Sequence, residues 1–256
     1  MTANRMERSI STNAIIIRRE RFGEFHKGLT LLTSDLGLVS ATAYGAYKMQ
    51  SRLRMGSEPF THCRALLYHN PVSRSYKVTD LEVRESFERL QADLPRIAAA
   101  SLWVEVVQKS YAAGELSDLL YRLFLDCLRL LDRGDARDTP YVTIQFLWRF
   151  LALSGYQLDT SRCDRCARPY GEASAAYYDA ATNAFFCEAC SQPSHLRLAA
   201  GGLRYLEASS SLGLEQAATI RLDATSLVSL RQAVLEVTQA VLEGRLATIR
   251  YLGVPT

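Results

Sequence analysis

The stretch NAIIIRRERFGEFHKGLTLLTSDLGLVSATAY, residues 13–44, contains three short apolar segments, and the turn-forming SDLG separates the last two. Two similar segments follow it, with an Asn-Pro pair between them. The five predicted strands span residues 13–22, 29–33, 38–44, 60–69 and 75–83. Five strands in so short a stretch predict a small closed or partly closed barrel, because a single sheet would leave one apolar face uncovered.

The rest of the chain has the spacing of helices. One helix is predicted to begin at Thr139 as N-cap, with Pro140 in the first helical position, and to end near Gly155. Another is predicted over residues 225–243. The fold class is therefore α+β, a barrel followed by a helical domain. The predicted domains are residues 1–80 and 81–256.

Four of the six cysteines form two C-x2-C pairs that are separated by 20 residues, inside an insert at about residues 159–194. A two-residue gap brings both sulfurs of a pair to the same side, and two pairs complete a tetrahedral set of soft ligands. The sequence YYDAATNAFF between the pairs has the pattern of a short hairpin with aromatic flanks. We predict one structural Zn²⁺ per chain, held by Cys163, Cys166, Cys187 and Cys190.

Other uses of these cysteines fit the sequence less well. A redox C-x-x-C is expected once and near a βαβ pattern. An iron–sulfur cluster can use four cysteines, but zinc is the commoner occupant of this layout. Catalytic zinc keeps an open position with three protein ligands, so four cysteines argue against hydrolysis.

Charge is unevenly distributed along the chain. The net charge is +3, but residues 1–80 contain twelve lysines and arginines against six acidic residues. The remaining residues hold 18 basic against 21 acidic side chains. A basic N-terminal third predicts an anionic partner for that part alone. The longest stretch without a charged residue has 12 residues, too short to cross a membrane. No apolar run near the start resembles a secretory signal, which predicts a cytoplasmic protein.

Cations and aromatic rings are interleaved in the basic third. A small barrel that presents both can hold nucleic acid, because cations contact phosphates and flat rings stack on bases of any identity. The rings are Phe22, Phe25, Tyr44 and Tyr47. The candidate nucleic-acid-binding residues are Arg18, Arg19, Arg21, Lys27, Lys48, Arg52 and Arg54. Any single ring is more simply explained as barrel core, but the cluster of seven cations favours nucleic acid.

The sequence favours binding over catalysis. It contains no phosphate-binding loop, no dinucleotide-binding glycine motif, no H-E-x-x-H and no G-x-S-x-G. The four histidines are scattered at positions 26, 62, 69 and 195, so they suggest no catalytic cluster. We therefore predict that the protein is not an enzyme.

At this point several stretches together resemble the RecO family of bacterial recombinational repair proteins. The matching stretches are FGE (22–24), LLTSDLG (31–37), YGAYKMQSRL (44–53), SGYQLDTSRCDRC (154–166) and the later CEAC (187–190). Their order and spacing cover nearly the whole chain. The resemblance implies an N-terminal OB-fold, a helical body and a zinc-ribbon-like insert within that body.

The resemblance also implies a function in DNA repair and recombination. It implies binding of single- and double-stranded DNA and annealing of complementary strands. With RecR, such a protein helps to load RecA onto single-stranded DNA coated by the single-stranded DNA-binding protein, SSB. Contacts with RecR and with the acidic, aromatic-ended SSB tail are expected, without nucleotide hydrolysis and in the bacterial cytoplasm near the nucleoid. Arg122 and Arg129 are candidates for the tail on chemistry alone.

The sequence departs from the family at three points. Phe25-His26 stand where an acid is usual, and Tyr47 precedes Lys48 where consecutive basic residues are usual. Ala167 follows the second cysteine, where zinc knuckles often have glycine. Two other functions stay open: a zinc-dependent nuclease or deaminase, for which no H-x-E pair is found, and a peptide-binding adaptor without DNA affinity.

Overall fold

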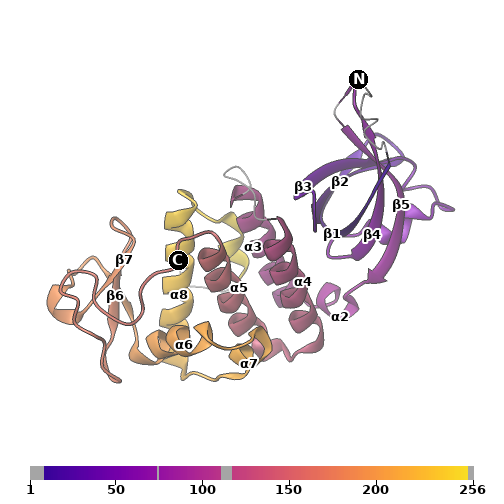
Figure 1. Cartoon of the computed structure of the whole chain (residues 1–256). Coiled ribbons are helices and arrows are strands. Elements are labelled where there is room, and N and C mark those ends of the chain that lie inside the picture. Colours follow the sequence, from indigo (N-terminus) through magenta and orange to yellow (C-terminus); the bar gives the residue numbers. More distant parts are fainter. Residues whose placement is uncertain (1–8, 74, 111–116, 253–256) are drawn as a thin grey trace. The chain divides into compact units, whose positions relative to one another are not determined.

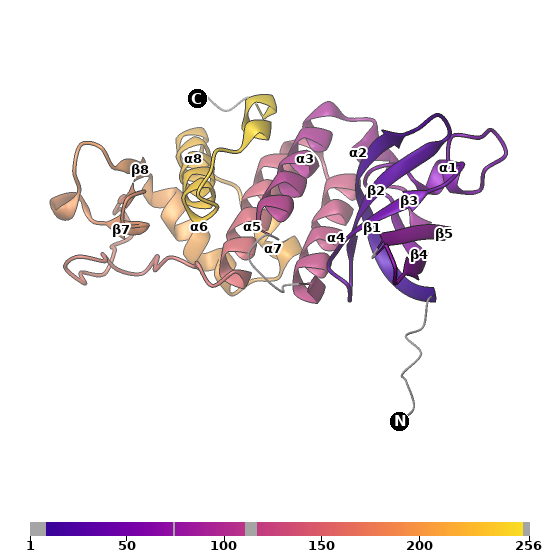
Figure 2. The ribbon, with the colours of Figure 1, turned by 90° about the horizontal axis from the view of Figure 1, so that it is seen from above.

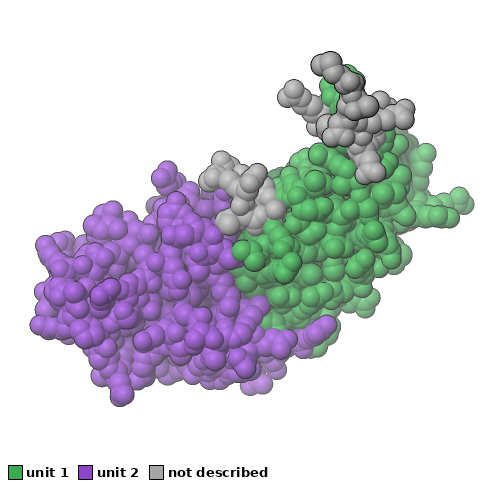
Figure 3. All heavy atoms as spheres, in the orientation of Figure 1, with its two compact units in different colours: residues 1–92, 113–132 green, residues 93–112, 133–256 purple. Residues whose placement is uncertain are grey.

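The computed structural model describes residues 9–73, 75–110 and 117–252. It divides into two compact units, shown in Figure 3. The first comprises residues 1–92 and 113–132, and the second comprises residues 93–112 and 133–256.

The first unit is built on a closed five-stranded barrel (Figure 1). Its strands are β1 (Ser9–Phe22), β2 (His26–Thr33), β3 (Leu38–Ala43), β4 (His62–Asn70) and β5 (Ser75–Glu85). They follow the order β1-β2-β3-β5-β4, and β1 also pairs with β4, which closes the barrel. All pairs are antiparallel except β3 with β5. This confirms the predicted α+β class with an N-terminal OB-type barrel. The predicted boundary at residue 80 falls within β5, which continues to Glu85.

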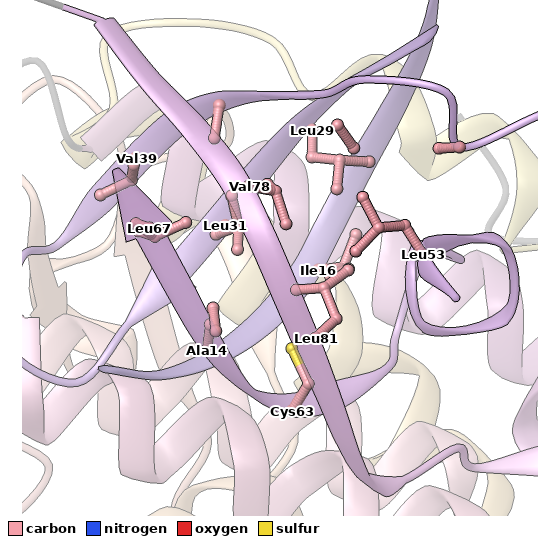
Figure 4. Packing of buried hydrophobic residues seen from close by; sticks show 14 residues of the cluster. Ala14, Ile16, Leu29, Leu31, Val39, Leu53, Cys63, Leu67, Val78 and Leu81 are labelled. Atoms are coloured by element: carbon pink, nitrogen blue, oxygen red, sulfur yellow. The ribbon is translucent and has the colours of Figure 1, made fainter. Parts of the chain in front are cut away.

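Alternation along the strands explains the barrel core. Successive side chains point to opposite faces, so every second residue of each strand reaches the interior. Ile16, Leu29, Leu31, Leu67 and Val78 are all almost completely buried there (Figure 4). Strand β1 pairs with two neighbours. Its first half pairs with β4 and its second half pairs with β2. The β1–β2 pairing has a register shift between Ile16 and Arg18.

Three of the described helices belong to the first unit: α1 (Leu53–Gly56), α2 (Glu88–Gln91) and α4 (Ser117–Arg133), the last up to residue 132. A polar network connects α4 to the barrel. The carboxylate of Glu85 accepts hydrogen bonds from Arg129, the shortest at 2.7 Å, and lies 2.8 Å from Nδ1 of His62. The hydroxyl of Tyr121 is 3.0 Å from Nε2 of the same histidine. Helix α4 is thereby bonded to both β4 and β5.

The second unit is a group of helices around α5 (Figure 2). Its helices are α3 (Leu94–Ser110), α5 (Thr139–Leu153), α6 (Ala200–Ser210), α7 (Leu214–Thr219) and α8 (Ala224–Val241). Helix α5 packs against α3, α7 and α8. The rings of Trp103 and Phe146 stack with centroids 4.8 Å apart in the contact between α3 and α5. Within the described residues, no helix is long and apolar enough to span a bilayer.

The start of α5 differs from the prediction by one residue. Its N-cap is Asp138, and Thr139 is the first helical residue. A short 3₁₀ helix, Ala136–Asp138, precedes it and is capped by Asp135. The 3₁₀ helix leads directly into α5, and within the described structure the Thr139 hydroxyl is buried without a hydrogen-bond partner.

The cysteine insert forms a small sheet of its own. Strands β6 (Ala176–Asp179), β7 (Ala184–Phe186) and β8 (Leu196–Leu198) are ordered β7-β6-β8, all antiparallel. The first two form the hairpin predicted from YYDAATNAFF. Asn183 occupies its turn with φ of +51°, a conformation that asparagine tolerates.

Candidate metal centre and nucleic-acid interface

The two cysteine pairs converge on one point. The sulfur atoms of Cys163, Cys166, Cys187 and Cys190 all lie within 4.8 Å of one another. The sulfurs of Cys166 and Cys187 are 3.8 Å apart. Tetrahedral zinc with bonds of about 2.3 Å requires sulfurs about 3.8 Å apart. Donor chemistry and spacing both fit, so the cluster can hold a metal ion.

Backbone N–H groups favour the thiolate form of Cys163. Burial raises the pKa of Cys163, but backbone N–H groups of Cys187, Cys166 and Arg165 outweigh that effect and lower the pKa to about 6, whereas hydrogen bonding to Cys187 raises the pKa of Cys190 to about 12. Metal ligands must be deprotonated, so these N–H groups favour the binding form. The cluster packs against Phe186 and Tyr170.

The seven predicted cations differ in their exposure and in their ion pairs. Arg18 forms an ion pair of 2.8 Å with Glu20. Arg19 forms one of 3.0 Å with Glu58. These two cations are exposed but partly compensated. Arg52 and Arg54 are also exposed, at the start of α1.

Lys27 does not belong to the exposed surface that the sequence predicted. Its side chain is 1% exposed, and its ammonium donates to Ser57 Oγ at 2.7 Å, to Glu58 at 2.9 Å and to the carbonyl of Arg54 at 3.2 Å. Lys27 lies two residues before Leu29 on β2, so its side chain points to the same inner face of the barrel. Burial of a charge requires such partners, so this lysine stabilises the segment around α1. We therefore remove it from the candidate interface.

The remaining cations lie over aromatic rings. Arg21 is 6.0 Å from the centroid of Tyr47, and Lys48 is 5.9 Å from that of Phe25. Backbone bonding places these rings: the N–H of Tyr47 donates to the carbonyl of Phe25 at 3.1 Å. The exposed fractions are 53% for Phe22, 42% for Phe25, 50% for Tyr44 and 38% for Tyr47. The rings are thus not barrel core, and cations accompany them at the surface.

Comparison with known proteins agrees with this geometry. Residues 6–87 match the family model described as recombination protein O N terminal, and residues 91–248 match recombination protein O C terminal.

The chain belongs to the RecO family.

Curated RecO relatives match most of the chain. A protein named DNA repair protein RecO from Anaeromyxobacter sp. (strain K) is 30% identical over 95% of each chain. Its namesake from Anaeromyxobacter dehalogenans (strain 2CP-1 / ATCC BAA-258) is 31% identical over 93% of each. That of Pelotomaculum thermopropionicum is 36% identical over 60% of this chain and 58% of its own length. The RecO family is a family of DNA repair proteins, which fits a surface of rings and cations.

The sequence analysis of this RecO-family chain missed two residues that lie beside the exposed rings. Lys77 on β5 lies 5.5 Å from the ring centroid of Tyr44. His26 lies between Phe22 and Tyr44, at 6.3 Å and 5.0 Å between centroids. Lys77 could not be found from spacing alone, because strand pairing brings it beside Tyr44. His26 directly follows Phe25 in the sequence, and the pairing of β2 with β3 brings it beside Tyr44 as well.

A second candidate site of the RecO-family chain is a groove of about 300 Å³ in the helical unit. Its apolar walls include Leu94, Pro140 and Tyr251. Arg231 lines it, half-buried, with a pKa that burial alone lowers, and its guanidinium donates to the carbonyl of Leu252. Among the described residues Arg231 has no carboxylate partner, and the hydroxyl of Thr139 in the same wall has no hydrogen-bond partner.

The arginines expected at an acidic ligand are both engaged within the first unit. Arg122 forms an ion pair of 2.8 Å with Asp118, on its own helix. Arg129 binds Glu85 and Asp126. Arg231 lies beside apolar walls without a carboxylate partner in the described chain, and the sequence alone did not single it out because its burial depends on α5 and residues 251–252.

Proposed function

We propose that this protein is a DNA-binding mediator of recombinational repair and has no catalytic activity of its own. It binds single- and double-stranded DNA, anneals complementary strands and acts with RecR to load RecA onto SSB-coated single strands. The pairing of exposed rings with Arg21, Lys48 and Lys77 on one small barrel is the observation that carries this proposal. Family membership supports it, since the relatives are named DNA repair proteins.

Phosphate neutralisation accounts for annealing in this proposal. Two complementary strands repel each other, and cations that bind one backbone lower the repulsion against the second. Arg18 and Arg19 contribute less than Arg21 and Lys48, because Glu20 and Glu58 already compensate them.

Charge reversal tests the DNA interface. The double variant Arg21→Glu, Lys48→Glu is expected to bind a single-stranded oligonucleotide at least tenfold more weakly. The slope of log affinity against log salt is expected to fall by about 1.4, because each phosphate contact on single strands contributes about 0.7. Fluorescence anisotropy over a salt series measures both quantities. Arg64→Glu is the matched control, since this arginine lies on β4 and bonds Ser11. An unchanged affinity and slope in the double variant would contradict the proposed interface.

We also propose that the four-cysteine centre holds one structural zinc ion. Three features support it: four sulfur donors within 4.8 Å of one another, a Cys166–Cys187 separation of 3.8 Å that fits tetrahedral zinc, and backbone N–H groups that favour a thiolate at Cys163. Four protein ligands leave no open position, so a role in hydrolysis is not proposed. Turnover of labelled DNA by zinc-loaded protein would instead favour the nuclease or deaminase alternative.

The groove at Arg231 is our proposed site for the SSB tail. An acidic peptide that ends in an aromatic residue matches apolar walls beside a cation that lacks a carboxylate partner in the described chain. Arg231→Gln is expected to weaken binding of a fluorescent tail peptide by about tenfold, while Arg122→Gln leaves it unchanged. Equal peptide affinity in Arg231→Gln and parent would show that the tail does not bind in this groove.

A further inference from the structure

The hydroxyl oxygen of Tyr170 is buried in the cysteine insert, and among the described residues it has no hydrogen-bond partner. A hydroxyl buried in this way destabilises a fold, because it gives up its bonds to water and gains none in return. A group that places an acceptor beside the hydroxyl would remove this cost.

Backbone pairing places Tyr170 beside the first cysteine knuckle. Residues 161–163 pair with residues 168–170 in a short antiparallel bridge, in which the N–H of Tyr170 donates to the carbonyl of Ser161 at 3.0 Å. Cys163 lies two residues after Ser161 and therefore shares its face of the bridge. Diagonal neighbours across an antiparallel pair lie within reach of an aromatic side chain. Tyr170 and Cys163 are such neighbours.

The ring of Tyr170 packs against the metal site from that position. Together with Cys187 and Cys190, it packs against the apolar cluster that contains Cys163 and Phe186. Burial raises the pKa of Tyr170 above its usual value, and the charge of thiolates at Cys163 and Cys187 adds to this effect. The hydroxyl therefore keeps its proton at neutral pH and is available as a donor.

Metal-bound thiolates are the acceptors that best suit this donor. Four thiolates around one divalent cation leave net negative charge on the sulfurs. Hydrogen bonds to a charged acceptor are stronger than bonds to a neutral one. Asp159 is a further anion near the hydroxyl, but its carboxylate already accepts bonds from Ser161 and Arg162.

We propose that Tyr170 is a positioning residue of the four-cysteine centre, whose hydroxyl donates a hydrogen bond to the metal-bound thiolates of Cys163 and Cys187. The bond favours thiolate over thiol and offsets repulsion between the sulfurs, so the metal is held more tightly. Groups that bond to metal ligands in this way change metal affinity by about 10- to 100-fold. The inference rests on the proposed zinc centre and adds to it a residue outside the four ligands.

Removal of the hydroxyl tests the proposal. Tyr170→Phe keeps the ring, and it is expected to bind zinc about tenfold more weakly in competition with a chromophoric chelator. The metal-free variant is expected to melt at the same temperature as the metal-free parent or higher, because it no longer buries an unpartnered hydroxyl. A tyrosine with only a packing role would not separate these two quantities.

Cobalt reports on the sulfurs directly. With Co²⁺ in place of zinc, the sulfur-to-metal charge-transfer band of Tyr170→Phe is expected at longer wavelength than that of the parent. The reason is that thiolates without this donor hold their lone pairs at higher energy.

Tyr178→Phe is the matched control. Tyr178 is also buried in the insert, but its hydroxyl donates to Asn183 at 2.9 Å. It pairs with Phe185, so it lies on the strand face opposite to that of Phe186 and the cysteines. This variant is expected to keep the zinc affinity and the cobalt band of the parent.

A second measurement needs no variant. In the parent loaded with an NMR-active cadmium isotope, the Tyr170 hydroxyl proton is expected to exchange slowly with water. It is also expected to show scalar coupling to the metal through the thiolate that accepts its bond.

Each alternative result decides between the two proposals. Equal zinc affinity in Tyr170→Phe and parent overturns the inference, as does an unshifted cobalt band or an equal shift in Tyr178→Phe. A Tyr170 hydroxyl proton that shows no coupling to cadmium also overturns it. In these cases the zinc proposal survives if the parent still contains zinc. A parent that binds neither zinc nor cobalt overturns both proposals.

Discussion

Ala167, the residue after the second cysteine, has φ of +57°, in the left-handed region that glycine adopts at little cost. The first knuckle enforces this angle, because the N–H of Ala167 donates to the carbonyl of Cys163 at 2.9 Å and the chain then returns to pair Arg168 with Cys163. A left-handed L-residue costs about 1–2 kcal/mol. The knuckle is therefore formed against local strain.

Ala167→Gly is expected to stabilise the protein by about 1 kcal/mol, because relief of strain exceeds the added entropy of unfolded glycine. Urea unfolding measures the change. The matched control is Ala181→Gly, an exposed turn alanine that has no positive φ and is expected to lose stability. A destabilised Ala167→Gly would show that the turn carries no strain.

Lys27 shows the difference between a cation on the surface and one inside the fold. Its three hydrogen bonds all go to the segment around α1. Lys27→Met is expected to destabilise the barrel by about 2 kcal/mol, since it removes the donor to Ser57 Oγ and to the carbonyl of Arg54, while Arg19 still donates to Glu58. The folded variant is expected to keep the salt slope of DNA binding within error, as measured by fluorescence anisotropy. A reduced salt slope of DNA binding would show that Lys27 contacts DNA after all.

At the scale of elements, the network around Glu85 connects β4, β5 and α4. The carboxylate only accepts hydrogen bonds, so Nδ1 of His62 carries a proton and Nε2 accepts from Tyr121. Hydrogen bonds from Arg129 lower the pKa of Glu85 from 4.5 to about 2, against the opposing effect of its own burial. Burial lowers the pKa of His62 below 6.5 despite the hydrogen bond to Glu85.

Both shifts make the first unit sensitive to acid. The unfolded chain takes up a proton at His62 below about pH 6.5 and at Glu85 below about pH 4.5, before the folded chain does. The contribution of Glu85 is complete above pH 4.5 and is lost as the pH falls toward 2. Glu85→Gln is expected to lose about 2 kcal/mol at pH 7 and to show a flatter pH dependence between pH 4.5 and 2 than the parent.

Urea unfolding at several pH values measures this effect. Glu82→Gln, an exposed acid on the same strand, is the control and is expected to match the parent. Parallel pH profiles for Glu85→Gln and parent would mean that the network adds nothing to stability.

At the scale of the whole molecule, chain order and compact units do not coincide. The first unit ends at residue 92, α3 belongs to the second unit, and residues 113–132 belong again to the first. The four-cysteine centre lies entirely in the second unit, and the rings and cations of the barrel lie entirely in the first. Stability of the insert and DNA affinity of the barrel should therefore respond separately to metal.

Removal of metal by a chelator is expected to lower the melting temperature of the helical unit by at least about 5 °C. Affinity for a short single-stranded oligonucleotide is expected to stay within about twofold. Cys163→Ser with Cys166→Ser should reproduce the loss, and Cys127→Ala, a buried cysteine outside the cluster, should keep its zinc. Absence of zinc from the parent by atomic absorption, with equal melting temperatures, would reject the metal proposal.

The sequence by itself determined the strands, the helices near residues 139–155 and 225–243, and the four-cysteine cluster. Period-two and helical patterns depend on neighbouring residues, and a C-x2-C chelate depends on one turn, so these features can be read locally. The tertiary structure alone decided which cations remain available. Arg19 meets Glu58 and Lys27 meets Ser57 across 39 and 30 residues of sequence, and these contacts exist only when the barrel closes. The same long-range register places His26 and Lys77 beside Tyr44. Charge and ring patterns predicted a nucleic-acid surface, and strand pairing determines which of these rings and cations lie together.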